Sequence, residues 1–162
     1  MYTKIYWLHQ LENNAQLGIS ARPRGGEWLQ GEIIHYKRSN IGMVIVLLEK
    51  EEITALSLRQ QEKHCVDNGI VYTNFPIPDR SVPTDNPAVN KLINAAIQLL
   101  QHGKSVLIHC RMGIGRSAII AGAVLMKITK SNATDILQHI TQVRGLEVPD
   151  TSAQIKWLQN RE

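Results

Sequence analysis

Short apolar runs alternate with longer amphipathic segments along most of the chain. Met43–Leu48 (MVIVLL) and Ser105–His109 (SVLIH) lack polar alternation, which is typical of strands buried on both faces of a parallel sheet. Ile70–Phe75 (IVYTNF) is a third strand candidate, and weaker candidates lie at Lys4–Leu8 and near Leu17–Ser20. We therefore expect a central sheet of about five strands, most of them parallel.

Segments with the period of an amphipathic helix fill the intervals between these runs. They are Glu27–Lys37, Glu51–Asn68, Asn90–His102, Arg116–Thr129, Asp135–Val143 and Ala153–Gln159. Gly69 and Gly103 stand where two of these helices are expected to end. Nearly every residue of Arg116–Thr129 is small or apolar, so this helix should be buried on most sides. The alternation predicts an α/β fold in three layers, with helices on both faces of the sheet and a single domain over residues 1–162.

The composition is that of an ordinary globular protein and narrows the functional classes. Of 162 residues, 43% are apolar and 20% charged, and the net charge is +4. Because Lys and Arg are scattered rather than clustered with aromatic residues, no nucleic-acid partner is expected. No apolar run approaches the roughly 18 residues of a membrane span, and the N-terminus has no signal-peptide core. We therefore expect no membrane association and a cytoplasmic location.

The chain has two cysteines, Cys65 and Cys110, which are expected to be reduced thiols. Paired Cys or His spacings that would indicate a zinc site are absent from the sequence. We therefore expect neither a metal nor another cofactor. Cys65 is expected to pack within its helix, and a role as resolving thiol for oxidised Cys110 is the less favoured alternative.

The segment that follows the strand at Ser105–His109 has the features of an anion-binding loop. A strand enters a glycine-bearing turn, which opens directly into the helix at Arg116. The first amides of a helix have no acceptor within the helix, and the helix dipole adds positive potential at this end. Gly113 and Gly115 allow the turn to adopt dihedrals that let successive N–H groups converge on one point.

Cys110 lies inside this loop, where a helix N-terminus and nearby cations favour the thiolate form of a cysteine. Arg116 follows six positions later, and its planar guanidinium can bind two oxygens of one phosphoryl group. A buried cysteine at a strand end is often only a small apolar residue. The combination with the glycines and the arginine at this spacing favours a nucleophile instead.

The nine residues HCRMGIGRS, from His109 to Ser117, match the His-Cys-x5-Arg-Ser signature of the protein tyrosine phosphatase superfamily. The short chain, together with Ala21–Gly26 (ARPRGG) and Gly69–Arg80, resembles the small (atypical) dual-specificity phosphatases. This resemblance covers most of the chain. It implies a phosphatase-like fold with a Cys-x5-Arg loop and the hydrolysis of phosphomonoesters on proteins. Phosphotyrosine is the expected target, with phosphoserine and phosphothreonine as further candidates.

The resemblance also implies a role for each residue of the signature. Cys110 would be the nucleophile that forms a cysteinyl-phosphate, and Ser117 the hydroxyl that eases departure of the thiolate. His109 would brace the loop and tune the thiol. The expected phosphate-binding residues are Arg111, Met112, Gly113, Ile114 and Gly115, through their amides, and Arg116, which would clamp the phosphate.

A general acid is needed because an alkoxide or phenoxide leaves poorly without a proton. The stretch FPIPDRSVP, from Phe75 to Pro83, resembles the acid loop of the family and places Asp79 after a predicted strand. Asp79 is therefore the expected acid, with Asp85 as the fallback. Gln154 loosely resembles a water-orienting glutamine, but a solvent-facing helix position is at least as plausible. Four arginines are candidates for a basic rim: Arg22, Arg24, Arg80 and Arg111.

Several other functions remain open on the same scaffold. The substrate could be a phosphoinositide or an RNA 5′-phosphate, because both present the same dianion to the loop. A rhodanese-like or arsenate-reductase-like enzyme would also use a loop cysteine, but it would leave Asp79 and the spacing of Cys110 and Arg116 unexplained. A catalytically silent phosphate-binding module would not need Cys110, Arg116 and Asp79 together.

Overall fold

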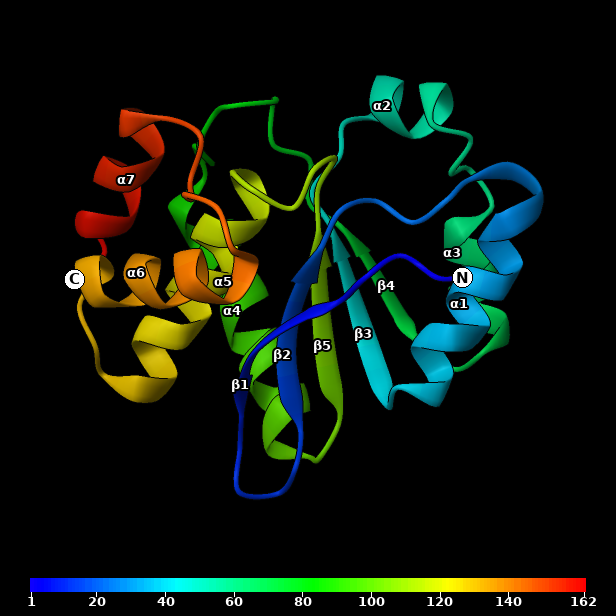
Figure 1. Ribbon diagram of the computed structural model, residues 1–162, viewed down its shortest axis with the longest axis horizontal. Coiled ribbons are helices and arrows are strands. Elements are labelled where there is room, and N and C mark those ends of the chain that lie inside the picture. The colour runs from blue at the N-terminus through cyan, green and yellow to red at the C-terminus, as the bar shows by residue number, and fades with distance from the viewer.

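The computed structural model describes residues 1–162 and contains a five-stranded mixed sheet between two layers of helices (Figure 1). The strands are β1 (Tyr6–Gln10), β2 (Gln16–Ser20), β3 (Ile41–Val46), β4 (Val71–Asn74) and β5 (Ser105–His109). Their order across the sheet is β1-β2-β5-β3-β4; β1 is antiparallel to β2, and the other neighbours are parallel. The prediction of a mostly parallel sheet of about five strands is confirmed.

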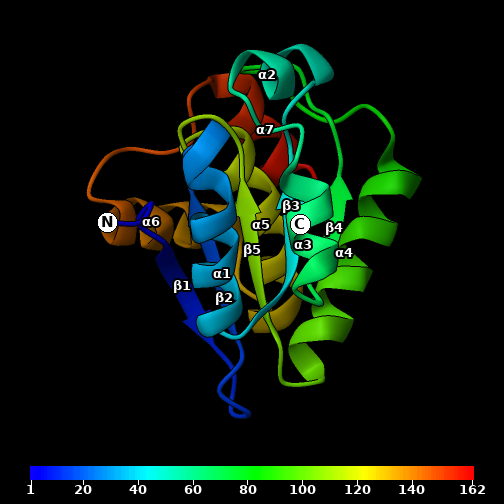
Figure 2. The ribbon, with the colours of Figure 1, turned by 90° about the vertical axis from the view of Figure 1, so that its right-hand side faces the viewer.

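Helices cover both faces of this sheet, as predicted. They are α1 (Leu29–Arg38), α2 (Lys50–Ala55), α3 (Gln61–Asp67), α4 (Asn86–Gln101), α5 (Arg116–Thr129), α6 (Ala133–Arg144) and α7 (Ser152–Gln159), and a 3-10 turn at Gly26–Trp28 precedes α1. Figure 2 shows α1 and α3 in front of the sheet, while α5, α6 and α7 lie behind it. None of these helices combines the length and the apolar character that crossing a membrane requires.

The two faces of the sheet bury two separate apolar clusters. Ile45, Val106 and Ile108 face the larger cluster beneath α4 and α5, whereas Val44 and Leu107 face the smaller one beneath α1 and α3. Successive side chains of a strand point to opposite faces, so a strand covered on both sides must be apolar throughout. This explains why the central strands showed no polar alternation.

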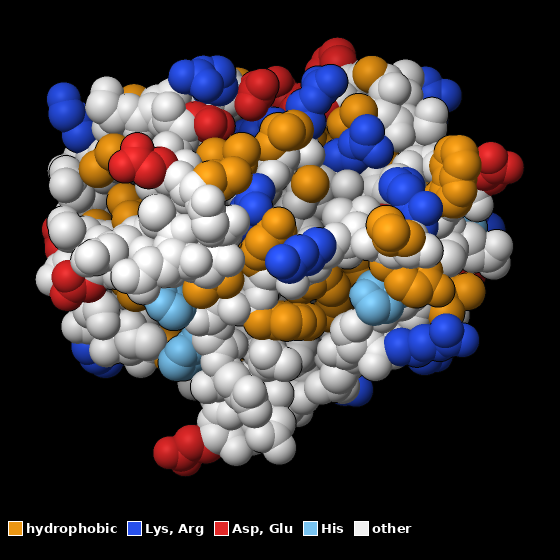
Figure 3. Space-filling model, in the orientation of Figure 1, with side chains coloured by type: hydrophobic (Ala, Val, Ile, Leu, Met, Phe, Trp, Pro, Cys, Tyr) orange, Lys and Arg blue, Asp and Glu red, His pale blue; other side chains and the backbone are white.

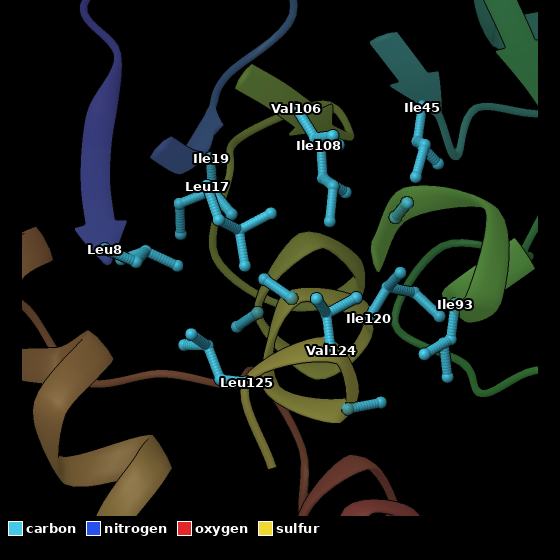
Figure 4. Close-up of a cluster of buried hydrophobic side chains, with 14 of the residues drawn as sticks. Leu8, Leu17, Ile19, Ile45, Ile93, Val106, Ile108, Ile120, Val124 and Leu125 are labelled. Atoms are coloured by element: carbon cyan, nitrogen blue, oxygen red, sulfur yellow. The ribbon is translucent and has the colours of Figure 1, made fainter. Parts of the chain in front are cut away.

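Helix α5 forms the centre of the larger cluster, and its burial is confirmed. All of its residues from Arg116 to Met126 are buried. Figure 4 shows Ile120 and Val124 of this helix directed toward Ile108 and Ile93. Because β5 leads into α5 through the signature loop, both sides of that loop are fixed by the core.

Most element ends shift by one or two residues from the prediction, and two differences are larger. The single helix expected over residues 51–68 is two helices, α2 and α3, because Ser57 adopts a left-handed conformation with φ of 57° and Leu58 turns into the smaller cluster. Helix α4 begins at Asn86 rather than at Asn90, because the Asp85 side chain accepts a hydrogen bond from the backbone N–H of Ala88.

Candidate active site

The carboxyl ends of the four parallel strands meet at one edge of the sheet. In the register of the sheet, His109 of β5 lies opposite Ser20 of β2 and Val46 of β3, and β4 pairs with β3 up to Asn74. The loops that leave these strands therefore begin side by side, at the top of Figure 1. In open α/β sheets, ligands bind at this edge, where the direction of chain progression changes.

The loop after β5 forms the glycine-bearing turn between strand and helix that the sequence predicted. Cys110 is buried, and the backbone N–H of Gly113 donates to its Sγ at 3.3 Å. Gly113 has a φ of 70°, and a Cβ there would lie 2.6 Å from the carbonyl carbon of Ser20. Only glycine satisfies both conditions, so the close approach of the loop to β2 depends on this residue.

Arg116 is buried, with its guanidinium held from several sides. Its two terminal nitrogens donate to both carboxylate oxygens of Glu52, at 2.7 and 2.9 Å, and one of them also donates to the carbonyl of Ile77 at 2.9 Å. Burial alone would lower the pKa of Arg116, but the hydrogen bond with Glu52 and the charges of nearby acidic groups raise it. The side chain is therefore a fixed cation at every working pH.

Glu52 was not anticipated from the sequence. It lies on α2, where its side chain also accepts from the backbone N–H of Glu49 in a capping box. Burial raises the pKa of Glu52, but the hydrogen bonds from Arg116 and from the Glu49 backbone outweigh this and lower it. A carboxylate in a short polar helix gives no local signal of such a contact, because its partner is 64 positions away.

Asp79 lies beside the guanidinium of Arg116. Its Oδ1 is 3.3 Å from a terminal nitrogen of Arg116, while its side chain remains 59% exposed. The structure therefore brings together the acid loop and the signature loop. Asp85, the fallback, is engaged as the N-cap of α4 instead.

His109 points away from the glycine-bearing turn, toward α3. It is fully buried, its Nδ1 is 3.1 Å from the carbonyl of Cys110, and its Nε2 is 2.9 Å from the amide nitrogen of Gln61. Burial lowers the pKa of His109 from 6.5 to about 4, so the ring is neutral. Because a carbonyl only accepts, Nδ1 carries the proton and Nε2 accepts from Gln61. The ring thus ties the loop to α3, a contact that the sequence did not reveal.

Ser117 begins the first turn of α5 and is fully buried. Its Oγ has no hydrogen-bond partner, which is unusual for a buried hydroxyl. The hydroxyl is therefore free to donate to a charged group that forms at the site. Its role in the departure of the thiolate stays a prediction.

Arg144, at the end of α6, braces the outer side of the signature loop and was also not anticipated. Its Nε donates to the carbonyl of Gly113 at 3.0 Å and a terminal nitrogen donates to the carbonyl of Met112 at 3.2 Å. The guanidinium also lies over the ring of Tyr6, 4.1 Å from its centroid. Holding these carbonyls outward leaves the N–H groups of the loop free to face an anion.

Gln154 does not face solvent, so that expectation was wrong. It is fully buried, its Oε1 accepts from the backbone N–H groups of Asp150 and Thr151, and its Nε2 donates to the carbonyl of Ser81 at 3.2 Å. This amide connects the start of α7 to the loop that carries Asp79. A Cβ on Gly115 would collide with the Asp150 carboxylate and crowd the Gln154 amide.

The remaining candidates have varied surroundings. Arg24 pairs with the buried Glu32 at 3.6 Å, Arg80 lies 4.0 Å from Asp150, and Arg111 is exposed. Cys65 is buried among the residues beneath α1 and α3, on the opposite face of the sheet from Cys110. Burial, with the charge of Glu62, raises the pKa of Cys65 to about 12. Such a thiol is unreactive, which argues against a resolving role.

Comparison with known proteins agrees with this geometry. A family model described as the dual specificity phosphatase catalytic domain matches residues 35–162, and the chain belongs to this family. Cyclin-dependent kinase inhibitor 3 of Rattus norvegicus is 26% identical over 131 residues, which cover 80% of this chain and 61% of the rat protein. The chain spans less than two thirds of this relative and a smaller share of two other curated relatives.

Solved structures show the same fold. A kinase associated phosphatase, crystallised with serine in place of its catalytic cysteine, has a TM-score of 0.87 and 21% identity, covering 99% of this chain and 94% of the other. PTPMT1 has a TM-score of 0.78 and 20% identity, covering 96% and 93%, and it has also been solved in complex with PI(5)P. The three-layer phosphatase-like fold is therefore confirmed.

Proposed function

We propose that this chain is a cysteine-dependent phosphatase that acts on phosphorylated proteins. The observation that carries the proposal is the juxtaposition of Cys110, whose Sγ accepts from the backbone N–H of Gly113, with the fixed cation of Arg116 and the carboxylate of Asp79. A phosphoryl group bound there would meet a nucleophile, a clamp and a proton donor at once. The family membership supports the same reaction class.

In the first proposed step, the Sγ thiolate of Cys110 attacks phosphorus and the P–O bond to the substrate breaks. The leaving oxygen takes a proton from Asp79, so an alcohol or phenol departs rather than an alkoxide or phenoxide. The amides of Arg111 to Arg116 and the guanidinium of Arg116 bind the equatorial oxygens, where charge is carried through the transition state.

In the second proposed step, water attacks the cysteinyl-phosphate and gives a proton to the carboxylate of Asp79. The P–S bond breaks, the electron pair returns to sulfur, and inorganic phosphate leaves. The free hydroxyl of Ser117 would donate to the departing thiolate. Because the thiol must stay reduced, we also propose that the protein works in a reducing compartment such as the cytoplasm.

We infer the substrate class from the two loop residues at the mouth of the site, Arg111 and Ile114. Arg111 is exposed there, but Ile114 packs partly against the larger apolar cluster. A second phosphate on an inositol ring would find no cation at Ile114 and would lose hydration beside an apolar wall. A phosphopeptide has a single dianion at the centre and suits this arrangement better, and the name of the kinase associated phosphatase points the same way.

The experiment that tests this proposal is hydrolysis of an aryl phosphate by the purified chain, with and without a chelator. We expect turnover that a chelator leaves unchanged, because the described residues contain no cluster of three metal-ligating groups. Cys110→Ser should remove the turnover. Activity that disappeared with the chelator and returned with a divalent metal would contradict the mechanism.

A further inference from the structure

A shallow surface pocket lies beside the candidate active site and has no part in the proposed chemistry. It is an open depression of about 460 Å³ between the loop Arg22–Trp28 and the end of α2 at Ala55–Ser57. We call it the side pocket. Both of its walls reach the active site: the backbone N–H of Arg22 donates to the carbonyl of Arg111 at 3.1 Å, and α2 carries Glu52, which holds Arg116.

The walls of the side pocket are held together by backbone contacts. The N–H of Gly26 donates to the carbonyl of Ser57 at 3.0 Å. A Cβ on Gly25 would overlap the carbonyl of Leu56, so only glycine allows the two walls to approach this closely. The side pocket is therefore a formed feature of the fold rather than a gap between loose loops.

The charge of the side pocket is positive. Arg22 and Arg24 line the pocket, and none of its lining residues is Asp or Glu. Glu27 of the same loop lies outside the lining. Arg22 has no ion pair, and its only side-chain hydrogen bond goes to the carbonyl of Pro23 at 3.3 Å. Arg24 lies 3.6 Å from the buried carboxylate of Glu32, and its side chain remains 39% exposed. Guanidinium groups with unused donors suit carboxylate or phosphate oxygens.

An apolar surface adjoins these arginines. The side chain of Trp28 is 54% exposed and forms one side of the pocket. Figure 3 shows blue Lys and Arg side chains interspersed with orange hydrophobic and red acidic ones along the upper part of the molecule, where the strands end. An exposed tryptophan beside paired cations is typical of a surface that contacts a partner chain.

We propose that the side pocket binds an acidic side chain that flanks the phosphorylated residue of a protein substrate, with the peptide lying against Trp28. This inference rests on the proposed phosphatase function and adds the sequence class of the substrate. The phosphoryl group occupies the signature loop, and the substrate peptide on one side of the phosphorylated residue passes over Arg111 toward Arg22. Acidic flanking residues meet Arg22 and Arg24, whereas lysines at the same positions are repelled.

The test compares three phosphotyrosyl peptides that differ only in having acidic, alanine or lysine flanks. Exposed ion pairs are individually weak, so two of them predict that kcat/KM is about tenfold higher for the acidic peptide than for the lysine peptide. Arg22→Gln should cut this ratio by about threefold, and Arg22→Lys should retain more of it. Trp28→Ala should raise KM for all three peptides, and a thermal melt checks that each variant folds.

Arg38→Gln is the matched control, because Arg38 lies in the last turn of α1, away from the side pocket, and should leave the ratio unchanged. Equal rates for the three peptides, or an equal loss for all of them in Arg22→Gln, would overturn the proposal. So would a clear preference for soluble inositol phosphates over every peptide. If the wild-type chain did not hydrolyse aryl phosphate either, the proposed function itself would fail.

Discussion

At the scale of single residues, Arg116 organises the candidate active site. Its buried guanidinium contacts Glu52 of α2, the Ile77 carbonyl and the Asp79 carboxylate. Glu52 fixes the orientation of the planar group through two parallel hydrogen bonds, which is the strongest geometry available to an arginine. Asp79 makes only a single longer contact and stays exposed, so it is free to turn toward a leaving group.

This difference leads to a prediction for Asp79. Asp79→Asn keeps the size of the side chain but removes the transferable proton, so phosphate esters with poor leaving groups should lose the most activity. We expect their kcat to fall about 100-fold or more, whereas esters with good leaving groups should lose much less. Steady-state rates over a series of aryl phosphates measure this difference.

Asp85→Asn is the matched control for that series. Asparagine caps a helix as well as aspartate does, so α4 should be retained and the dependence on the leaving group unchanged. If the rate of the Asp85 variant, and not that of the Asp79 variant, depended steeply on the leaving group, Asp85 would be the general acid instead.

At the scale of elements, the signature loop is held from two sides by helices that are distant in sequence. Helix α3 holds it through the contact between Gln61 and His109, and helix α6 holds it through Arg144. The first contact pairs the buried ring of His109, whose Nδ1 binds the carbonyl of Cys110, and the second holds the carbonyls of Met112 and Gly113. A nest of N–H groups binds an anion only while these carbonyls point outward.

Arg144 therefore has a measurable role in positioning the loop. Arg144→Met keeps most of the apolar packing on Tyr6 but removes both hydrogen bonds, and each such bond from a charged donor is worth about 1.5–3 kcal/mol. We expect kcat/KM to fall at least tenfold, inorganic phosphate to inhibit more weakly, and alkylation of Cys110 at a fixed pH to be less well blocked by added phosphate. The last two measurements separate a displaced loop from general destabilisation.

Arg161→Met provides the comparison for this experiment. Arg161 also lies over an aromatic ring, that of Trp157, at 5.0 Å, but it contacts no part of the loop. This variant should keep both the inhibition by phosphate and the protection of Cys110 by phosphate unchanged. If the Arg144 variant behaved in the same way, the bracing role would be disproved.

At the scale of the whole molecule, the buried neutral ring of His109 makes stability depend on pH. Its pKa is lowered by burial from 6.5 to about 4, so between these values the unfolded chain binds a proton that the folded chain does not. The free energy of unfolding should therefore fall as the pH drops from about 6.5 toward 4. This one group contributes about 2–3 kcal/mol to the loss between pH 7 and pH 4.5.

Urea unfolding at these two pH values tests this contribution. His109→Asn should be less stable than the wild type at pH 7, but it should lose about 2–3 kcal/mol less on acidification. His102→Asn, which alters an exposed histidine, should lose as much as the wild type. An equal loss in the wild type and the His109 variant would show that His109 is already charged in the folded protein.

The sequence predicted those parts of the molecule that are local in the chain. The strand, turn and helix from Ser105 to Thr129 lie in one segment, so their apolar pattern, glycines and Cys110–Arg116 spacing could be interpreted together. The same is true of Asp79 in its proline-rich loop. The layered fold followed from the alternation of apolar strand patterns with amphipathic helix patterns, because the helices bury their apolar sides by packing on the faces of the sheet.

The contacts that complete the site could not be predicted in this way. Glu52, Gln61 and Arg144 are polar residues in amphipathic helices, a pattern that equally describes any solvent-facing position. Only the packing of α2, α3 and α6 around the loop gives them partners. Ser57 was missed for a related reason, because a serine in a left-handed conformation is set by the tertiary turn rather than by its own preference.

The most direct test of the central claim is to capture the cysteinyl-phosphate itself. Ser117→Ala removes the hydroxyl that would assist the departing thiolate, so the second step should slow more than the first. Rapid acid quench during turnover of an aryl phosphate, followed by mass spectrometry, should then show one phosphoryl group on the peptide that contains Cys110. Sustained turnover with no phosphoryl group on Cys110, in the wild type and in this variant, would contradict the account.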